Sequence, residues 1–264
     1  MESFRKQGSE AAIASEAAGL RWLQEAVDDG GAAVAELAEV GDTWLETRLM
    51  PHASPTGEEA AEFGRRLART HAAGAGWWGC APREGVVGEQ MLAGLPLPTV
   101  HRPTYASFGE FFAAARLEPY LRMADILDDT ERRTLARAVG RVADGAFDST
   151  QPGAVVASGH GAARTHGDLW GGNVVWARTR GGVVGTLIDP AAHGGHAESD
   201  LAALHLFGSP HLASTIAGYR EVSPLADGWR DRIGMHQLHL LLVHVVLFGR
   251  SYVGDTVRIA SGLS

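Results

Sequence analysis

The stretch that decides the fold is Thr165-His-Gly-Asp-Leu-Trp-Gly-Gly-Asn173, followed by Leu187-Ile-Asp-Pro190. Two strand-like runs, at residues 174–177 and 183–188, separate the two motifs. His, Asp and Asn side chains beside such a hairpin, with a second Asp at its end, are costly to bury for packing alone. Transfer of a phosphoryl group to a hydroxyl uses these residue types, because an Asp takes the hydroxyl proton while carboxylate and amide oxygens hold Mg²⁺. The pattern therefore predicts a phosphoryl-transfer site.

Spacing within the first motif favours the same interpretation. Asp168 precedes Asn173 by five positions, the offset of the H-R-D-x-x-x-x-N catalytic loop of protein kinases. Asp189 lies where the metal-binding Asp after the next strand pair would fall. An ordinary turn is the competing interpretation, since Asp, Asn and Gly dominate turns for conformational reasons. The loop, its spacing and the Asp that closes the hairpin are together much more specific than an isolated His-x-Asp match.

Length and composition indicate a soluble globular chain. Its 264 residues fit one large domain or two small lobes, and 45% hydrophobic residues supply a core. The net charge of −8 lacks the basic surface that nucleic-acid binding requires. The single cysteine, Cys80, cannot form an internal disulfide. The longest strongly apolar run, residues 238–248, is shorter than the roughly 20 residues of a membrane span. We therefore expect a cytoplasmic protein without nucleic-acid or membrane partners.

Hydrophobic periodicity predicts an α+β fold. A helix is expected over residues 9–27, and a hairpin over residues 33–40 and 43–50. A crossing between lobes follows at Met50-Pro51, so we expect a small lobe at residues 1–50 and a mainly helical lobe at residues 51–264. The expected features of the larger lobe are a helix at 56–71, a long irregular connection at 74–103, helices at 107–127 and 130–147, and helices in the remainder to Tyr252.

At its motifs the chain resembles the fructosamine kinase (ketosamine-3-kinase) family, relatives of the aminoglycoside phosphotransferases within the protein-kinase-like fold. The resemblance rests on residues 166–173, 188–191 and 195–202, and continues through the middle and the helical tail. It implies a two-lobed fold and an ATP-dependent kinase acting on a sugar hydroxyl of ketoamines, which are fructosamine- or ribulosamine-type glycated amines. Because the phosphorylated adduct falls apart, the resemblance also implies a deglycation role, with small-molecule or protein-bound ketoamines as substrates.

The resemblance assigns a role to each candidate residue. Asp168 would be the catalytic base, and Asn173 and Asp189 would bind Mg²⁺. Lys6 would contact the phosphates of ATP, with Glu16 as its ion-pair partner.

Three further candidates surround the catalytic loop. Trp170 follows the proposed base closely, where its ring could stack on the sugar. His166 and Asp200 are expected to brace the loop rather than to touch substrate.

The N-terminus departs from the family pattern. Five residues stand before Lys6, whereas the family has two strands and a phosphate-covering turn before this lysine. We therefore expect a truncated small lobe that binds ATP without the covering loop. There are two alternatives. Either the start of the sequence has been assigned too far downstream, or the protein binds a nucleotide or a sugar without catalysis.

Substrate specificity has a second interpretation. His193-Gly194 replaces aromatic residues of the family, and Ala197 replaces an Arg. A kinase for an aminoglycoside or another amino-sugar is therefore the alternative, although the Leu-Trp-x-Gly-Asn form of the loop favours ketoamines. A zinc hydrolase is disfavoured because the H-E-x-x-H spacing is missing, and His236 and His239 are expected to pack in a helix interface.

Overall fold

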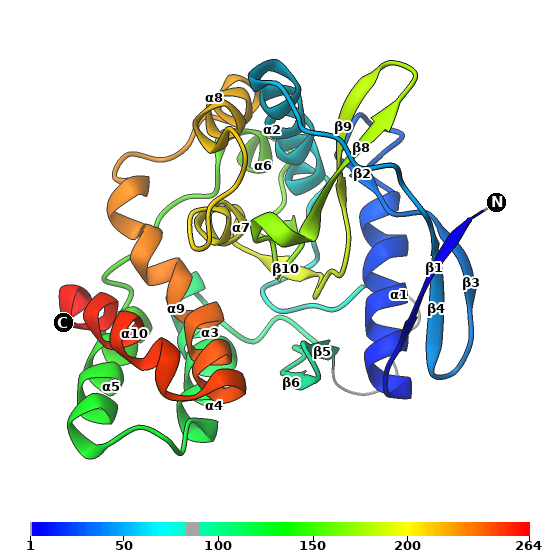
Figure 1. Cartoon of the computed structure of the whole chain (residues 1–264). Coiled ribbons are helices and arrows are strands. Elements are labelled where there is room, and N and C mark those ends of the chain that lie inside the picture. The colour runs from blue at the N-terminus through cyan, green and yellow to red at the C-terminus, as the bar shows by residue number, and fades with distance from the viewer. Residues whose placement is uncertain (1, 83–89) are drawn as a thin grey trace. The chain divides into compact units, whose positions relative to one another are not determined.

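The computed structural model describes residues 2–82 and 90–264, and Figure 1 shows their helices and strands. The chain forms two compact units, each built from two separate segments. The first unit comprises Met1–Arg102 and Gln151–Ala226, and the second comprises Pro103–Thr150 and Asp227–Ser264. The predicted boundary between residues 50 and 51 lies inside the first unit, so the division into lobes at that point stays a prediction.

A three-stranded antiparallel sheet forms the N-terminal part of the first unit. Its strands, in spatial order, are β1 (Ser3–Gln7), β4 (Trp44–Arg48) and β3 (Leu37–Val40). Successive side chains of a strand point to opposite faces. Arg5 therefore stacks on Trp44 and pairs with Glu46 at 2.7 Å on one face, whereas Lys6 lies on the other. The β3–β4 hairpin was predicted, although its first strand was expected to start at residue 33 and starts at Leu37, and β1 was not predicted.

Helix α1 (Glu10–Gln24) follows β1 and confirms the predicted first helix. The Ser9 hydroxyl accepts a hydrogen bond from the Ala12 N–H, which satisfies one of the free amides at the helix start. Its buried face includes Ile13, Leu20 and Leu23.

A second sheet connects this region to the catalytic motif. Its strands, in spatial order, are β2 (Ala33–Val34), β9 (Gly182–Leu187) and β8 (Val174–Thr179). β2 runs parallel to β9, and β8 and β9 form the predicted hairpin. The chain after β4 lies along β8, because the Arg178 N–H donates to the Pro51 carbonyl and the Ala53 N–H donates to the Trp176 carbonyl.

Two pairs of short strands complete the sheets of the first unit. They are β7 (Ala163–Thr165) with β10 (His193–Gly195), and β5 (Gln90–Leu92) with β6 (Leu95–Leu97). Ala93 and Gly94 join β5 to β6 with φ values of 49° and 82°, which suits a two-residue hairpin turn. This hairpin lies within residues 74–103, so the expectation of an irregular connection was wrong there.

Besides α1, the described residues of the first unit form the helices α2 (Gly57–Ala72), α6 (Gly153–Ala157), α7 (Ala197–Leu204) and α8 (Leu212–Val222). Figure 1 shows α2 and α8 side by side. A methyl group at Gly64 would collide with the Thr215 carbonyl, and one at Gly218 would collide with the Ala61 carbonyl. The two helices therefore pack so closely that neither position has room for a side chain.

The second unit is helical. Its elements are α3 (Phe108–Phe112), the π-helical turn η1 (Ala113–Leu117), α4 (Glu118–Met123), α5 (Asp129–Ala143), α9 (Trp229–Phe248) and α10 (Arg250–Leu263). Helices were predicted in these regions, although the final one was expected to stop near Tyr252. Instead the chain bends at Gly249 and α10 continues to Leu263. His236 lies 5.3 Å from Phe108 and His239 lies 5.2 Å from Tyr120, measured between ring centroids, so both pack against aromatic rings.

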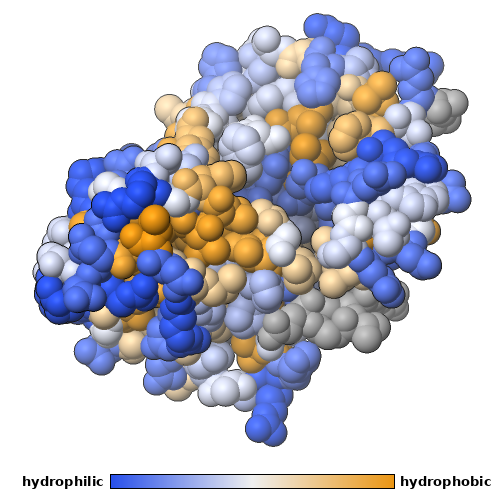
Figure 2. Space-filling model, turned by 60° about the horizontal axis from the view of Figure 1, so that its bottom comes forward, coloured by the Kyte–Doolittle hydropathy of each residue, from blue (hydrophilic) through white to orange (hydrophobic). Residues whose placement is uncertain are grey.

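The surface mixes polar and apolar side chains. Figure 2 shows a hydrophobic patch bordered by hydrophilic residues on one face. Met123, Ile126 and Phe248 are large apolar side chains of the second unit that stay exposed. Within residues 2–82 and 90–264, no helix has both the length and the apolar character that a membrane crossing needs.

Candidate active site

The catalytic loop connects β7 to β8. After Thr165 the chain turns at Gly167, whose φ of 82° is a left-handed conformation that favours glycine. A methyl group there would also collide with the Ala191 carbonyl. The loop then forms a single 3₁₀ turn, η2 (Gly171–Asn173), in which the Asn173 N–H donates to the Trp170 carbonyl at 2.9 Å.

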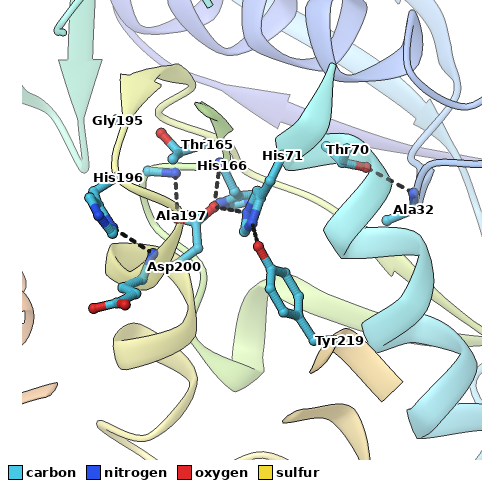
Figure 3. Close-up of polar contacts among 12 residues, drawn as sticks. Ala32, Thr70, His71, Thr165, His166, Gly195, His196, Ala197, Asp200 and Tyr219 are labelled. Atoms are coloured by element: carbon cyan, nitrogen blue, oxygen red, sulfur yellow. Dashed lines mark hydrogen bonds and ion pairs between the residues drawn. The ribbon is translucent and has the colours of Figure 1, made fainter. Parts of the chain in front are cut away.

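Asp200, on α7, binds the start of this loop from behind. Its carboxylate accepts hydrogen bonds from the backbone N–H groups of His166, at 2.6 Å, and Gly167, at 3.0 Å. It also accepts a third bond from Nε2 of His71 at 3.1 Å (Figure 3). Burial raises the pKa of Asp200, but His71 and these bonds outweigh burial and hold the pKa below its ordinary value. Asp200 is therefore an ionised bracing group.

His71 continues the network toward α8. Since its Nε2–H donates to Asp200, its Nδ1 accepts from the Tyr219 hydroxyl at 2.9 Å (Figure 3). Burial raises the pKa of Tyr219, which keeps the hydroxyl protonated as a donor. Sequence reasoning gave His71 and Tyr219 no part in the site. The close packing of α2 on α8 brings them together.

His166 links the catalytic loop to the end of β9. Its Nδ1 accepts from the Asp168 N–H at 3.2 Å, and its Nε2–H donates to the Ile188 carbonyl at 2.8 Å. Burial lowers the pKa of His166, so the ring is neutral and fixed in one tautomer. One imidazole thus connects the backbone of Asp168 to that of Ile188, the residue before Asp189.

Asp168 and Asn173 are joined directly. Nδ2 of Asn173 donates to the backbone carbonyl of Asp168 at 2.8 Å and to its Oδ2 at 3.0 Å. Burial raises the pKa of Asp168 to about 7, and the negative charges of Asp189 and Asp200 contribute, while Asn173 and Lys6 oppose the shift. Such a perturbed carboxyl in a cleft is typical of catalytic acids and bases.

Lys6 pairs with two carboxylates. Its Nζ lies 2.7 Å from Oε2 of Glu16 and 3.1 Å from Oδ1 of Asp189. Burial lowers the pKa of Lys6, but attraction to Glu16 and Asp189 outweighs it and raises the pKa above its usual value. Burial raises the pKa of Glu16, and repulsion by Asp189 adds to this effect. Asp189 itself has a φ of 53°, a conformation that non-glycine residues adopt at an energetic cost, often at functional sites.

These side chains line one cleft of about 630 Å³. Of the predicted site residues, the structure places six at this cleft: Lys6, Glu16, Asp168, Trp170, Asn173 and Asp189. His166 and Asp200 are buried behind the catalytic loop. The Trp170 ring stays 37% exposed and meets Phe207 edge-on, with ring centroids 5.8 Å apart.

The turn of the β5–β6 hairpin also lines the cleft, through Ala93 and Gly94. Sequence reasoning missed this contribution. The available signal was the Ala-Gly pair between two short apolar runs, which is compatible with a hairpin turn. Its Pro96, however, argued against a strand, since proline is confined to sheet edges.

The donor set fits a magnesium ion. Mg²⁺ prefers hard oxygen ligands and is usually held by one or two carboxylates together with substrate phosphates. Asp189 offers a carboxylate that is 43% exposed. Asn173 uses its nitrogen for Asp168, which leaves its Oδ1 as the coordinating atom of the amide. The residues present therefore suit this ion.

The fold and this arrangement of side chains place the chain in the kinase-like fold class. The ADP-bound crystal structure of an aminoglycoside phosphotransferase matches it with a TM-score of 0.53, covering 94% of this chain and 83% of that one, at 9% identity. The chain belongs to the fructosamine kinase family, whose model matches residues 4–263. The predicted family and the α+β kinase-like fold are thereby confirmed.

Individual relatives agree with this assignment. The crystal structure of a protein described as a fructosamine-3-kinase from Thermobifida fusca has a TM-score of 0.83 and 37% identity, covering 99% of this chain and 85% of that one. A ketosamine-3-kinase from Mus musculus is 37% identical over 99 residues, and a protein named as a ketoamine kinase from Enterococcus faecium is 40% identical over 87. These stretches cover 38% and 33% of this chain, and the chain spans only 30% of the length of each curated relative.

Proposed function

We propose that this chain transfers the γ-phosphoryl group of ATP to a sugar hydroxyl of a ketoamine, either free or attached to protein. The observation that carries the proposal is the convergence of Lys6, Asp168 and Asp189 on one cleft. Family membership supports the kinase activity, and the names of the relatives support a glycated amine as the acceptor. Breakdown of the phosphorylated product would release the amine, which gives the protein a deglycation role.

Asp168 would accept the proton of the attacking hydroxyl. A carboxylate with a pKa near 7 is a stronger base than an ordinary aspartate, yet a large fraction of it is ionised at neutral pH. Asn173 donates to Oδ2 and so orients the carboxyl group. The Oδ1 atom of Asp168 is then the acceptor for the substrate hydroxyl.

Lys6 would bind the phosphates of ATP, and Glu16 would hold the ammonium group in place. The short Lys6–Glu16 contact supports this division of roles. Asp189 and Asn173 would hold Mg²⁺, which neutralises phosphate charge during transfer.

Trp170 would provide the wall on which the sugar stacks. Its ring is partly exposed, it lines the same cleft as Asp168, and Phe207 packs against its edge. An aromatic face of this kind suits the apolar face of a sugar ring, while its neighbour limits rotation.

Release of ADP from MgATP tests the proposal. The purified chain is incubated with a ribulosamine, a fructosamine and an aminoglycoside in parallel, and we expect release with the two ketoamines. Release with the aminoglycoside alone would replace the proposed acceptor class. Binding of MgADP without release in any of the three reactions would identify a non-catalytic binder instead.

A further inference from the structure

The β5–β6 hairpin makes hydrogen bonds to two of the segments that carry charged residues of the cleft, those of Glu16 and Asp189. The Met91 N–H donates to the hydroxyl of Ser15, on α1, at 3.1 Å. The Nε2 of Gln90 donates to the carbonyl of Ala192 at 2.6 Å. Ser15 and Gln90 are both buried. Ser15 directly precedes Glu16, and Ala192 lies three residues after Asp189, so the hairpin bridges the two segments.

The same two segments are in contact at other points. A methyl group at Gly19 of α1 would lie 3.0 Å from Cγ of Pro190, so the helix packs directly on the segment after Asp189. At the cleft, Lys6 joins Glu16 to Asp189 through contacts of 2.7 and 3.1 Å. The relative position of Glu16 and Asp189 is therefore held by the ion pairs of Lys6 and by the two hydrogen bonds of the hairpin.

Nucleotide binding would change the balance between these two connections. Lys6 and Asp189 are the groups that would turn to the phosphates and their counter-ion, so the direct Lys6–Asp189 contact competes with the ligand. The bonds of Ser15 and Gln90 involve neither side chain and are unaffected by this competition.

We propose that Ser15 and Gln90 are positioning residues, which keep Glu16 and Asp189 in the geometry that binds the nucleotide. The proposal rests on the proposed function, because it assumes that the cleft receives a magnesium-bound nucleotide. It assigns to the hairpin a role in nucleotide affinity in addition to its contribution to the stability of the fold.

The test compares Ser15→Ala and Gln90→Met with a matched control. Methionine keeps the length of Gln90 without its donor, and Oε1 of Gln90 finds no hydrogen-bond partner among the described residues, so little else is lost. The control is Thr70→Val, because the buried Thr70 hydroxyl accepts from the Ala32 N–H at 2.9 Å, as Ser15 does from Met91 (Figure 3). Each variant is examined by thermal unfolding and by calorimetric titration with MgADP.

We expect Ser15→Ala and Gln90→Met each to weaken MgADP binding about threefold to tenfold, the range of one hydrogen bond. Both should lower kcat while the KM for the sugar substrate stays constant. Thr70→Val should lower Tm by about as much as Ser15→Ala does, without changing MgADP affinity. Unchanged affinity in both hairpin variants, or an equal loss in Thr70→Val, would overturn the proposal. Absence of MgADP binding by the wild-type chain would instead overturn the proposed function, and the positioning role with it.

Discussion

The Nδ2 atom of Asn173 lies 3.0 Å from Oδ2 of Asp168 and 2.8 Å from the carbonyl oxygen of the same residue. The five-residue spacing noted in the sequence is thus closed by two hydrogen bonds from one amide. Asp168 and Asn173 act as a unit, so the orientation of the proposed base depends on the proposed metal ligand.

Replacement of Asp168 tests the base directly. Asp168→Ala should lower kcat by about 10²- to 10⁴-fold, because a positioned general base contributes roughly that factor. MgADP affinity should stay near the wild-type value, since Lys6 and Asp189 remain. Asp42→Ala, an exposed change in the β3–β4 turn, serves as the control. Turnover at the wild-type rate in Asp168→Ala would remove Asp168 from the mechanism.

The pH dependence of kcat/KM follows from the raised pKa of Asp168. The base is active when ionised, so activity should rise with pH and reach half of its maximum near pH 7. The hydrogen bond from Asn173 lowers the pKa of Asp168. The residual kcat/KM of Asn173→Ala should therefore rise at a higher pH than that of the wild type. A profile that is flat between pH 5 and 8 would contradict the assignment.

Lys6→Met should raise the KM for ATP or lower kcat by at least tenfold, because the ammonium group is the cation nearest to Asp189 in the cleft. Arg5→Met is the matched control, because Arg5 directly precedes Lys6 in the same strand and pairs with Glu46 on the opposite face. If both variants retain wild-type steady-state parameters, Lys6 is not the nucleotide lysine.

Asp200→Asn should reduce the free energy of unfolding by roughly 2–4 kcal/mol at pH 7, because three donors, those of His71 and His166 buried, lose their ionised acceptor. A carboxyl whose pKa is lowered by folding stabilises the protein above its unfolded pKa and loses this effect as the pH falls. The difference in free energy of unfolding between Asp200→Asn and the wild type, measured with urea, should therefore become smaller below about pH 4. Tyr219→Phe, one bond further from the loop, should cost about 1 kcal/mol.

Trp170→Ala should raise the KM for the sugar substrate severalfold and leave the KM for ATP unchanged, because the ring faces the cleft beside Asp168. Phe4→Ala, which removes another exposed ring from the first unit, is the control. Steady-state kinetics with each substrate varied in turn separates the two effects. Equal changes in both constants would indicate a general loss of structure.

The convergence of Asp168, Asn173 and Asp189 on one cleft could be predicted because these residues lie close together in the sequence. Asp168, Asn173 and the loop between them lie in six consecutive residues, and Asp189 follows one hairpin later. Lys6 and Glu16 were assigned by family resemblance alone. Lys6 lies in the strand Ser3–Gln7, whose one large apolar residue, Phe4, stays exposed. This strand therefore has no alternation of apolar and polar residues from which it could be predicted.

The remaining contacts depend on partners that are distant in sequence. β10 consists of His193, Gly194 and Gly195, residues of low strand propensity, and it is a strand because β7 pairs with it. His71 and Tyr219 meet because two glycines let α2 and α8 approach, a relationship that no local pattern expresses. Tertiary contacts decide such elements, whereas local sequence decides the capped helix α2.

In the proposed function, the side chains of the cleft would also select the charge state of the nucleotide. Among the described residues that line it, the carboxyl groups of Glu16, Asp168 and Asp189 outnumber the single ammonium group of Lys6. A bare polyphosphate would therefore be repelled by the cleft, and its complex with a divalent cation would be repelled less because its negative charge is smaller. If the cleft binds the nucleotide as proposed, it would discriminate by electrostatics before any contact with the base or the ribose, and we expect occupancy by ADP to follow the concentration of free Mg²⁺.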